Sequence, residues 1–127
     1  MTAHALIIDD DAYSVHIIER LLDQQDIAYT SVKDPTQLTS VLQTLDQVDI
    51  IFLDLEMPHL DGYEALEILK SHFGDRVPIV ACTVHTAEIH TTQKLGFFSF
   101  VAKPLDFSRF PNQLKRILDG NPVWEAR

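Results

Sequence analysis

The sequence predicts an α/β fold in which helices cover both faces of a parallel β-sheet. Short apolar runs rich in Ile, Val and Phe alternate five times with longer segments whose apolar residues recur at helical spacing. Three of the runs are apolar almost throughout, as strands buried on both faces must be. Repeated strand and helix units of this length favour right-handed crossovers, so we expect a doubly wound sheet of five parallel strands with five helices.

The strands are predicted from the apolar runs, and the helices from the periodic segments. The five strands are expected at residues 5–9, 27–32, 49–54, 78–83 and 98–102. The five helices are expected at residues 12–25, 35–46, 62–73, 86–95 and 108–119. In the first helix, Val15, Ile18 and Leu22 fall at i, i+3 and i+7, which places them in one stripe that packs on the sheet.

Residues at the helix boundaries agree with these ranges. Asp11 is the predicted N-cap of the first helix, and the Asp-Pro-Thr sequence at 34–36 starts the second helix in a similar way. Ser108 is predicted to cap the last helix, with Pro111 in its first turn, where a missing N–H costs nothing. Gly120 follows the last helical residue and predicts the end of that helix.

Length and composition favour one domain with a substantial core, because 46% of the 127 residues are hydrophobic. We expect this domain to span residues 1–120, followed by a tail at 121–127. The tail holds the only tryptophan, Trp124, and the sequence leaves open whether it folds back on the domain or contacts a partner. The single cysteine, Cys82, lies in an apolar run and is interpreted as a buried core residue; a chain without disulfides favours a reducing, cytoplasmic setting.

The charge balance and the termini exclude several classes of function. The formal net charge of −9 disfavours direct binding to nucleic acid, because that affinity comes from Lys and Arg side chains that neutralise phosphates. The N-terminus lacks the basic flank and the length of a signal peptide or a membrane span, so we expect a soluble protein without a membrane partner. His85 and His90 are five residues apart, which does not match the spacing of a helical zinc pair.

Polar side chains gather where the predicted strands end. In order along the chain, these ends carry Asp9, Asp10, Asp11, Asp54, Thr83 and Lys103. In doubly wound sheets, ligands bind outside the carboxyl ends of the strands. We therefore expect carboxylates, a hydroxyl and an ammonium group to converge at one edge of the sheet.

This set of groups suits metal-assisted phosphoryl transfer. Crowded carboxylates repel one another, so a cation among them offsets the cost of placing them together. Mg²⁺ prefers oxygen ligands and is typically held by one or two carboxylates plus a phosphate oxygen. Asp54 is then a candidate nucleophile, because an aspartate takes up a phosphoryl group as a covalent acyl phosphate. A Thr hydroxyl and a Lys ammonium group complete the charge neutralisation that this transfer needs.

The same residues lie in motifs that resemble the response-regulator receiver domain of two-component signalling, of the stand-alone type. The motifs are the acidic pair in "LIIDDDA", the acceptor in "FLDLEMPHLDG", Thr83 in "PIVACT", Phe100, and the Lys-Pro of "FVAKPLD". The resemblance covers roughly the first 120 residues, a size usual for one domain. It implies a flavodoxin-like receiver fold with the strand order 2-1-3-4-5.

The resemblance also implies a role for each site residue. Asp54 would accept a phosphoryl group from a phosphohistidine on a histidine kinase or a histidine phosphotransfer protein. The cofactor, Mg²⁺ or Mn²⁺, would be held by Asp10 directly, by Asp9 mostly through water, and by Asp54 and the backbone carbonyl of Glu56. Lys103 would pair with the phosphoryl group, and the bond from Lys103 to the following proline is often cis in this family.

Two further residues would carry the signal away from the site. By the same resemblance, Thr83 would move to hydrogen-bond the phosphoryl group, and Phe100 would turn inward with it. The change would reach the face made by residues 86–95, 98–102 and 108–119, which would contact a downstream effector protein. The chain would act as a monomer or as a phosphorylation-dependent dimer, with at most self-phosphorylation and autodephosphorylation as its own enzymatic activity.

At several positions the sequence departs from the family pattern. Val84 follows Thr83 where the family usually has Ala or Gly, and its bulk is expected to narrow access to the acceptor. Glu56 and His85 occupy the two variable positions that tune the lifetime of the acyl phosphate in this family. Before the fifth strand the family usually has Gly-Ala, whereas this chain has Gly-Phe-Phe at residues 96–98. We interpret at least one of the two aromatic residues as a core residue.

Three other functions are compatible with parts of the pattern. A flavodoxin-like electron carrier would need hydroxyls and Gly after the first strand to hold the FMN phosphate, where this chain has an acidic run. A haloacid-dehalogenase-type phosphatase would carry its nucleophile on the first strand, with a second Asp as the general acid. The strongest alternative is a receiver-shaped interaction module that works without phosphorylation, although such modules usually lose an acid, the acceptor or the lysine, all of which are present here.

Overall fold

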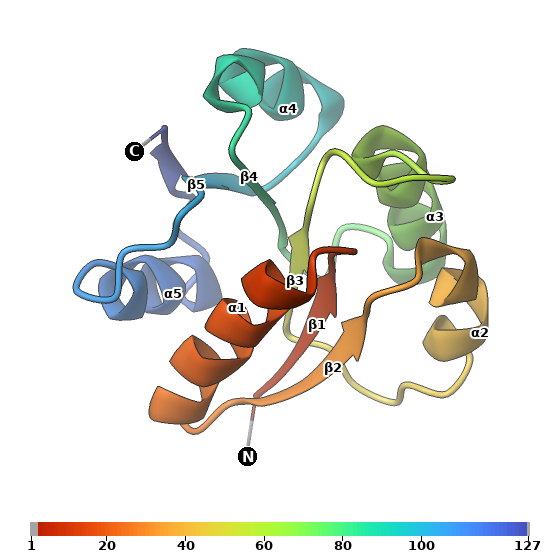
Figure 1. The fold of residues 1–127 in the computed structure, drawn as a ribbon, viewed down its shortest axis with the longest axis horizontal. Helices are drawn as coiled ribbons and strands as arrows, with labels where there is room; N and C mark the ends of the chain where they lie inside the picture. Colours follow the sequence, from red (N-terminus) through yellow and green to blue (C-terminus); the bar gives the residue numbers. More distant parts are fainter. Residues whose placement is uncertain (1–2, 127) are drawn as a thin grey trace.

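The computed structural model describes residues 3–126 and consists of a parallel sheet with helices on both faces (Figure 1). The strands are β1 (His4–Ile8), β2 (Ala28–Val32), β3 (Ile50–Leu53), β4 (Ile79–Thr83), β5 (Ser99–Ala102) and β6 (Trp124–Glu125). The helices are α1 (Ala12–Gln24), α2 (Leu38–Leu42), α3 (Gly62–Phe73), α4 (Ile89–Leu95) and α5 (Phe110–Leu118). The strand order is β2-β1-β3-β4-β5-β6, so the predicted α/β class and the order of the first five strands are confirmed.

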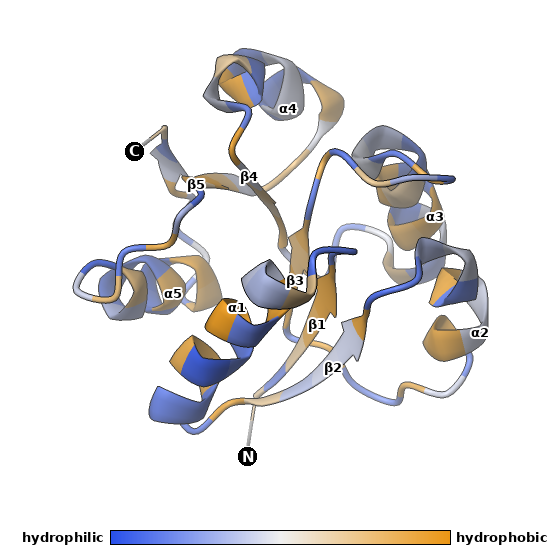
Figure 2. Cartoon of the chain, in the orientation of Figure 1, coloured by the Kyte–Doolittle hydropathy of each residue, from blue (hydrophilic) through white to orange (hydrophobic). Residues whose placement is uncertain are grey.

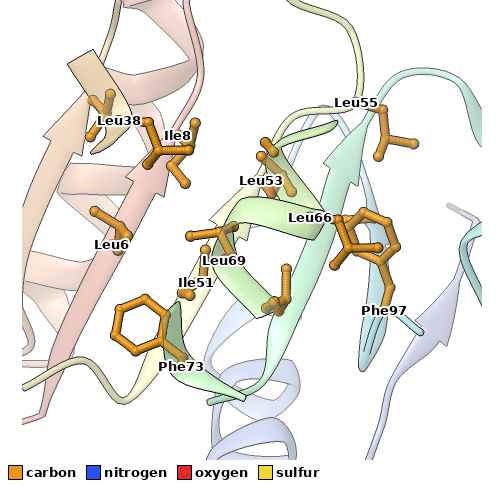
Figure 3. Close-up of a cluster of buried hydrophobic side chains, with 14 of the residues drawn as sticks. Leu6, Ile8, Leu38, Ile51, Leu53, Leu55, Leu66, Leu69, Phe73 and Phe97 are labelled. Carbon is orange, nitrogen blue, oxygen red and sulfur yellow. The ribbon is translucent and has the colours of Figure 1, made fainter. Parts of the chain in front are cut away.

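Each face of the sheet carries its own hydrophobic core, because side chains alternate between the two faces along a strand. In β1, Ala5 and Ile7 share a core with α1 and α5, whereas Leu6 and Ile8 share a core with α2 and α3. All four side chains are fully buried. Figure 3 shows the second of these cores, in which leucine and phenylalanine side chains of α3 lie over the strands. Each fully buried Leu, Ile or Phe contributes about 1.5–3 kcal/mol relative to an exposed one.

Helix α1 has the amphipathic pattern that the sequence predicts. Val15, Ile18 and Leu22 are all buried, and Figure 2 shows the alternation of apolar and polar residues along the helix. The Asp11 side chain accepts a hydrogen bond from the backbone N–H of Tyr13 at 3.1 Å, which confirms the predicted N-cap.

Two of the predicted helices open with a 3₁₀ turn, so each α-helix begins three residues later than expected. The segment predicted at 35–46 is a 3₁₀ turn (Pro35–Gln37) followed by α2, which ends at Leu42. Just beyond it, the hydroxyl of Thr44 donates to the carbonyl of Val41 at 2.7 Å and turns the chain away. Similarly, the segment predicted at 86–95 opens with a 3₁₀ turn (Thr86–Glu88) before α4.

The predicted cap of α5 is wrong. Ser108 does not cap the helix; the carboxylate of Asp106 accepts hydrogen bonds from the backbone N–H of Ser108 at 2.8 Å and from that of Arg109 at 3.3 Å. These bonds hold the turn that precedes α5, whose N-cap position is taken by Arg109 without a side-chain cap hydrogen bond. Pro111 does lie in the first turn, and Gly120, with a φ of 90°, follows the end of the helix as expected.

The prediction of five strands is also wrong, because the tail adds a sixth. Residues Trp124 and Glu125 form β6, which pairs in parallel with β5. The preceding residue, Val123, is fully buried in the core that α5 shares. The tail at 121–127 is therefore joined to the domain over its described part, and the question that the sequence left open for Trp124 is answered in favour of folding back.

The sheet brings the ends of its strands to one edge. In register, Ile8 lies opposite Leu53, and Thr83 lies opposite Ala102. The residue after each of these strands therefore reaches the same end of the molecule. Within residues 3–126, no helix is long and apolar enough to cross a membrane. Cys82 is buried in β4 as predicted, and burial raises the pKa of its thiol to about 12.

Candidate functional site

Three carboxylates meet at the carboxyl edge of the sheet. Asp9 and Asp10 follow β1, and Asp54 follows β3; one oxygen of each lies within 4.8 Å of the others. Backbone hydrogen bonds to neighbouring strands hold Asp9 and Asp54 in place. The N–H of Asp9 donates to the carbonyl of Val32 at 3.1 Å, and the N–H of Asp54 donates to the carbonyl of Ile8 at 2.9 Å. Asp9 is 2% exposed and Asp54 is 9% exposed, whereas Asp10 reaches solvent. The acidic cluster predicted from the sequence is therefore assembled.

The environment of Asp54 resists ionisation. Burial is the largest cause, and it raises the pKa of Asp54 from 3.8 to about 6, with Asp9 and Asp10 adding to the rise through their negative charges. Lys103 acts in the opposite direction because its positive charge favours the carboxylate. At neutral pH most of Asp54 is nevertheless ionised, so its side chain is available as a nucleophile.

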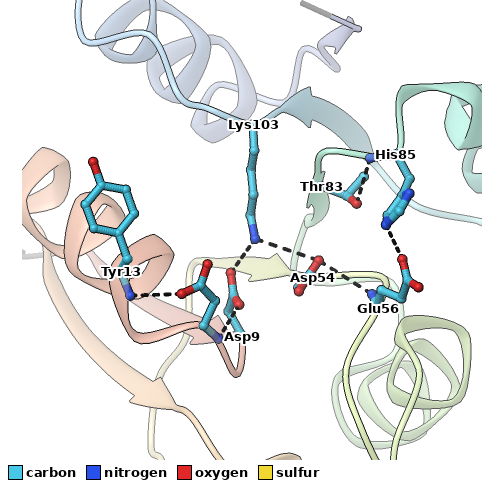
Figure 4. Close-up of polar contacts among 8 residues, drawn as sticks. Asp9, Tyr13, Asp54, Glu56, Thr83, His85 and Lys103 are labelled. Atoms are coloured by element: carbon cyan, nitrogen blue, oxygen red, sulfur yellow. Dashed lines mark hydrogen bonds and ion pairs between the residues drawn. The ribbon is translucent and has the colours of Figure 1, made fainter.

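Lys103 contributes the cation of the site and contacts two of the carboxylates (Figure 4). Its Nζ donates to Oδ2 of Asp9 at 2.6 Å and lies 3.7 Å from Oδ1 of Asp54. Burial opposes the charge of Lys103, but the hydrogen bond to Asp9 and nearby negative charges outweigh it and raise the pKa of the ammonium group. The peptide bond from Lys103 to Pro104 is cis, as the resemblance implies.

Gly62 allows the start of α3 to lie against the backbone that follows β3. A Cβ at this position would lie 2.5 Å from Cα of Leu55 and 2.8 Å from the carbonyl oxygen of Asp54. The N–H of Gly62 also donates to the carbonyl of Leu55 at 2.8 Å, and Asp61 caps the new helix by accepting from the N–H of Glu64. Only a residue without a side chain fits this close approach to the backbone that follows Asp54.

A pocket of about 510 Å³ opens over Asp54. It is lined by Asp10, Asp11, Asp54, Glu56, Met57, Pro58, Val84, His85 and Lys103. At its rim, Nε2 of His85 contacts a carboxylate oxygen of Glu56, so the loops after β3 and β4 are joined across the mouth (Figure 4). The sequence singled out both residues separately, but nothing in it indicated that they touch.

The structure places Thr83 and Phe100 in the core next to the site. Thr83 is fully buried, and its Oγ1 accepts a hydrogen bond from the backbone N–H of His85 at 3.1 Å; it is not among the described residues that line the pocket. Phe100 is fully buried in the core on the α2 and α3 side of the sheet. Phe97 is also a core residue at 4% exposure, as predicted for at least one of the two adjacent aromatics. Val84, in contrast, is 63% exposed beside the pocket.

The groups present suit a hard divalent cation. Three carboxylates that offer oxygen atoms within 4.8 Å of one another match the ligands that Mg²⁺ prefers, and the exposed Asp10 leaves room for water in the coordination sphere. No described His or Cys joins the cluster, so the donor set does not resemble a zinc site.

Comparison with known proteins identifies the family. Residues 5–115 match the family described as response regulator receiver domain. The chain belongs to this family. The receiver domain therefore accounts for nearly all of the chain, and the residues of the acidic cluster, the lysine and the threonine all lie within the matched range.

Curated relatives of this receiver domain are longer proteins. The chain is 30% identical over 127 residues to the transcription factor SKN7 of Saccharomyces cerevisiae, covering 98% of this chain and 20% of that protein. It is 29% identical over 122 residues to the regulatory protein VirG of Agrobacterium tumefaciens, covering 94% of this chain and 45% of that protein. The chain thus spans less than half the length of these two relatives.

Two of the solved structures share the fold over almost their whole length. The chemotaxis protein CheY4 of Vibrio cholerae superposes with a TM-score of 0.81 at 20% identity, covering 92% of this chain and 99% of that chain. The receiver domain of a sensor histidine kinase from Pseudomonas aeruginosa superposes with a TM-score of 0.81 at 25% identity, covering 94% and 99%. That structure is described as having a magnesium ion coordinated in its active site cleft.

Proposed function

We propose that this receiver domain accepts a phosphoryl group on Asp54 from a phosphohistidine of a histidine kinase or a histidine phosphotransfer protein. The observation that carries the proposal is the position of Asp54. This nearly buried carboxylate, at the end of β3, faces a pocket that is also lined by Asp10, Asp11, Glu56 and Lys103. A surface aspartate would not be surrounded in this way.

The chemistry requires one bond to form and one to break. A carboxylate oxygen of Asp54 attacks phosphorus while the bond from phosphorus to the imidazole nitrogen breaks, and the electron pair leaves with the imidazole. A bound Mg²⁺ or Mn²⁺ would neutralise the charge that gathers on the phosphoryl oxygens. Asp9, Asp10, Asp54 and the backbone carbonyl of Glu56 are the proposed residues that hold it.

Lys103 is proposed to change partners as the phosphoryl group arrives. Its ammonium group now donates to Asp9 at 2.6 Å and lies farther from Asp54 at 3.7 Å. A phosphoryl group on Asp54 brings new negative oxygens within reach, so the ammonium group can bridge them without a large movement. The hydroxyl of Thr83, which accepts from His85 in this state, still has a proton to donate to the same oxygens.

An apolar surface next to the acceptor favours a protein as the phosphodonor. A groove of about 490 Å³ adjoins Lys103 and is lined by side chains that include Tyr13, Val84 and Phe107. These three are 74%, 63% and 53% exposed, although each is large and apolar over most of its surface. Exposed apolar side chains that gather in one place mark interaction sites. We place the docking site of the histidine-bearing protein here.

The signal is proposed to leave by contact with a downstream effector at the face of α4, β5 and α5. Phe100 lies in β5, which ends directly before Lys103, so a change at the lysine acts on the strand that carries this aromatic ring. The contact between Glu56 and His85 crosses the mouth of the pocket, and we propose that it slows the entry of water that would hydrolyse the acyl phosphate. The active form is proposed to be a monomer or a phosphorylation-dependent dimer.

The test is the intact mass of the protein after incubation with Mg²⁺ and a small acyl phosphate donor. We expect wild type to gain one phosphoryl group, and Asp54→Asn to gain none. Asp46→Asn is the matched control, because Asp46 is an exposed aspartate outside the site, and it should be modified like wild type.

A negative result would be followed by one further variant. Val84→Ala removes bulk from the rim of the pocket and should speed modification by a small donor if access limits the reaction. If neither wild type nor Val84→Ala gains mass from the donor or from a phosphorylated histidine protein, the domain would be an interaction module that works without phosphorylation.

A further inference from the structure

The last described strand occupies the free edge of β5. In β6, Trp124 lies opposite Phe100 and Glu125 lies opposite Val101, in parallel. The backbone N–H of Phe100 donates to the carbonyl of Val123 at 2.7 Å. Figure 1 shows this segment beside β5, between α4 and α5. Without it, β5 would present unpaired N–H and C=O groups, which is the arrangement that recruits a further strand.

Next to the edge of β5, the core encloses one aliphatic side chain of the tail. Val123 is fully buried in the core that α5 shares. Its N–H donates to Oγ of Ser99 at 2.9 Å, and Ser99 is itself fully buried. The next residue, Trp124, packs on the core of the opposite face. The side chains of an incoming strand therefore divide between both faces, as they do in the rest of the sheet.

Side chains of α5 and of the residue before it bind Glu125, the acidic residue of the tail. One carboxylate oxygen of Glu125 accepts from Nη2 of Arg109 at 2.8 Å and from Nε2 of Gln113 at 2.6 Å. Nη1 of Arg116 lies 3.5 Å from the other oxygen. Two guanidinium groups and an amide thus surround one carboxylate, and such charge-assisted contacts select an acid over other side chains.

The tail is held over a short stretch, mainly by the buried side chain of Val123, and its ionic contacts add little. Only two residues are assigned to β6, and both guanidinium groups are partly exposed, so each ion pair contributes little after solvent screening. The buried amide oxygen of Gln113 has no hydrogen-bond partner in the described part of the chain. An unsatisfied buried acceptor costs about 1–3 kcal/mol, which offsets part of the gain from the contacts with Glu125.

We propose that the edge of β5 and the basic side of α5 form a strand-binding site, occupied here by residues 122–125 and open to an extended acidic segment of a partner protein. The partner segment would carry an aliphatic residue, an aromatic residue and an acid in succession, and would pair in parallel with β5 by β-augmentation. It must compete with a tethered tail whose effective concentration is in the millimolar range. The proposal does not require phosphorylation of Asp54, although the strand-binding site lies on the same face of α4, β5 and α5 that we propose contacts the effector.

The first experiment releases the tail in the full-length chain. Glu125→Lys places a positive charge against the two arginines, and Glu67→Lys, at an exposed position of α3, is the matched control. Trp124 is the only tryptophan, so its fluorescence reports docking directly. We expect red-shifted emission and stronger quenching by acrylamide for Glu125→Lys, and no change for Glu67→Lys. Unchanged emission and quenching in Glu125→Lys would overturn the proposal.

Hydrogen exchange locates the change and shows that the domain stays folded. In Glu125→Lys, the amide of Phe100 should exchange at least about tenfold faster, because its acceptor is in the tail. The amide of Lys103, which donates to Thr83 on β4 at 2.9 Å, should keep its protection. Faster exchange at both amides would mean global destabilisation and would contradict a detachable strand.

The second experiment tests binding in trans. A peptide with the sequence of residues 121–127 is added at millimolar concentration to ¹⁵N-labelled Glu125→Lys, beside a control peptide with Lys in place of Glu. With the peptide of residues 121–127, we expect a saturable chemical-shift change of the Phe100 amide and slower hydrogen exchange of that amide. With the control peptide we expect neither change. Equal effects of both peptides, or none from either, would refute the strand-binding site. A dimer of wild type that exchanges tails would assign the site to a second copy of this chain and overturn the partner assignment.

Discussion

Replacing Asp54 by its neutral amide, asparagine, should stabilise the fold at neutral pH. The pKa of Asp54 is about 6 in the folded state against 3.8 for an ordinary aspartate. A raised carboxylate pKa means that the folded state binds the proton more tightly than the unfolded chain does. The folded state therefore loses stability as pH rises from about 4 to about 6, and the loss stays constant above that range.

The size of the effect follows from the two pKa values. At 1.36 kcal/mol per unit, the difference corresponds to about 3 kcal/mol of stability that wild type lacks at neutral pH. Asp54→Asn keeps the shape of the side chain and removes the charge, so it should gain up to this amount. For a domain of this length the gain corresponds to roughly 10 °C in Tm. At about pH 5 the gain should fall to about half, because wild-type Asp54 is then largely protonated.

The assay is thermal and urea unfolding of wild type and Asp54→Asn in a metal-chelating buffer, at about pH 7.5 and about pH 5. Asp46→Asn, at an exposed position, is the control and should stay within about 0.5 kcal/mol of wild type at both pH values. A gain of equal size at both pH values, or a loss of stability at neutral pH, would refute the reasoning that burial raises the cost of the Asp54 charge.

Two further predictions concern the metal and the loop. Saturating Mg²⁺ should raise the Tm of wild type, because a ligand at 100 times its Kd stabilises the native state by about 2.7 kcal/mol. Asp10→Asn should lose most of this increase in Tm, and Asp46→Asn should keep it. A wild-type Tm that does not change with Mg²⁺ would argue against the metal site. Gly62→Ala should destabilise the domain by about 3 kcal/mol in urea unfolding, because the added Cβ meets the backbone of Leu55 at 2.5 Å. Ser71→Ala, at an exposed position of the same helix, is its control and should stay within about 0.5 kcal/mol; an equally small effect of Gly62→Ala would show that the loop relaxes.

The fold and the acidic cluster could be predicted because they depend on strong, repeated signals. Strands buried on both faces are apolar at nearly every position, as β3 and β4 are, and this pattern is hard to mistake. Once the strands are parallel, residues that follow them must meet at one edge. The proximity of Asp9, Asp54 and Lys103 therefore follows from topology, although the residues are far apart in sequence.

The parts that the sequence did not predict are short or depend on contacts between distant loops. Strand β6 has two residues, too few for any periodicity, and only the buried Val123 and half-buried Trp124 mark it as part of the core. The contact between Glu56 and His85 joins two loops whose relative position no local pattern encodes. The cap of α5 was misassigned because the helix begins two residues later than predicted, after a turn in which Asp106 binds the backbone N–H groups of Ser108 and Arg109.

The hydrogen bond between Asp9 and Lys103 joins residues that are 94 positions apart. Its two ends directly follow β1 and β5, and β3 and β4 lie between these strands in the sheet. Contacts between residues so far apart in sequence are typical of domains that fold slowly. A chain that ends before β5 lacks Lys103 and therefore lacks the ammonium group that neutralises Asp9. The complete site thus depends on both the first and the last of the five long strands.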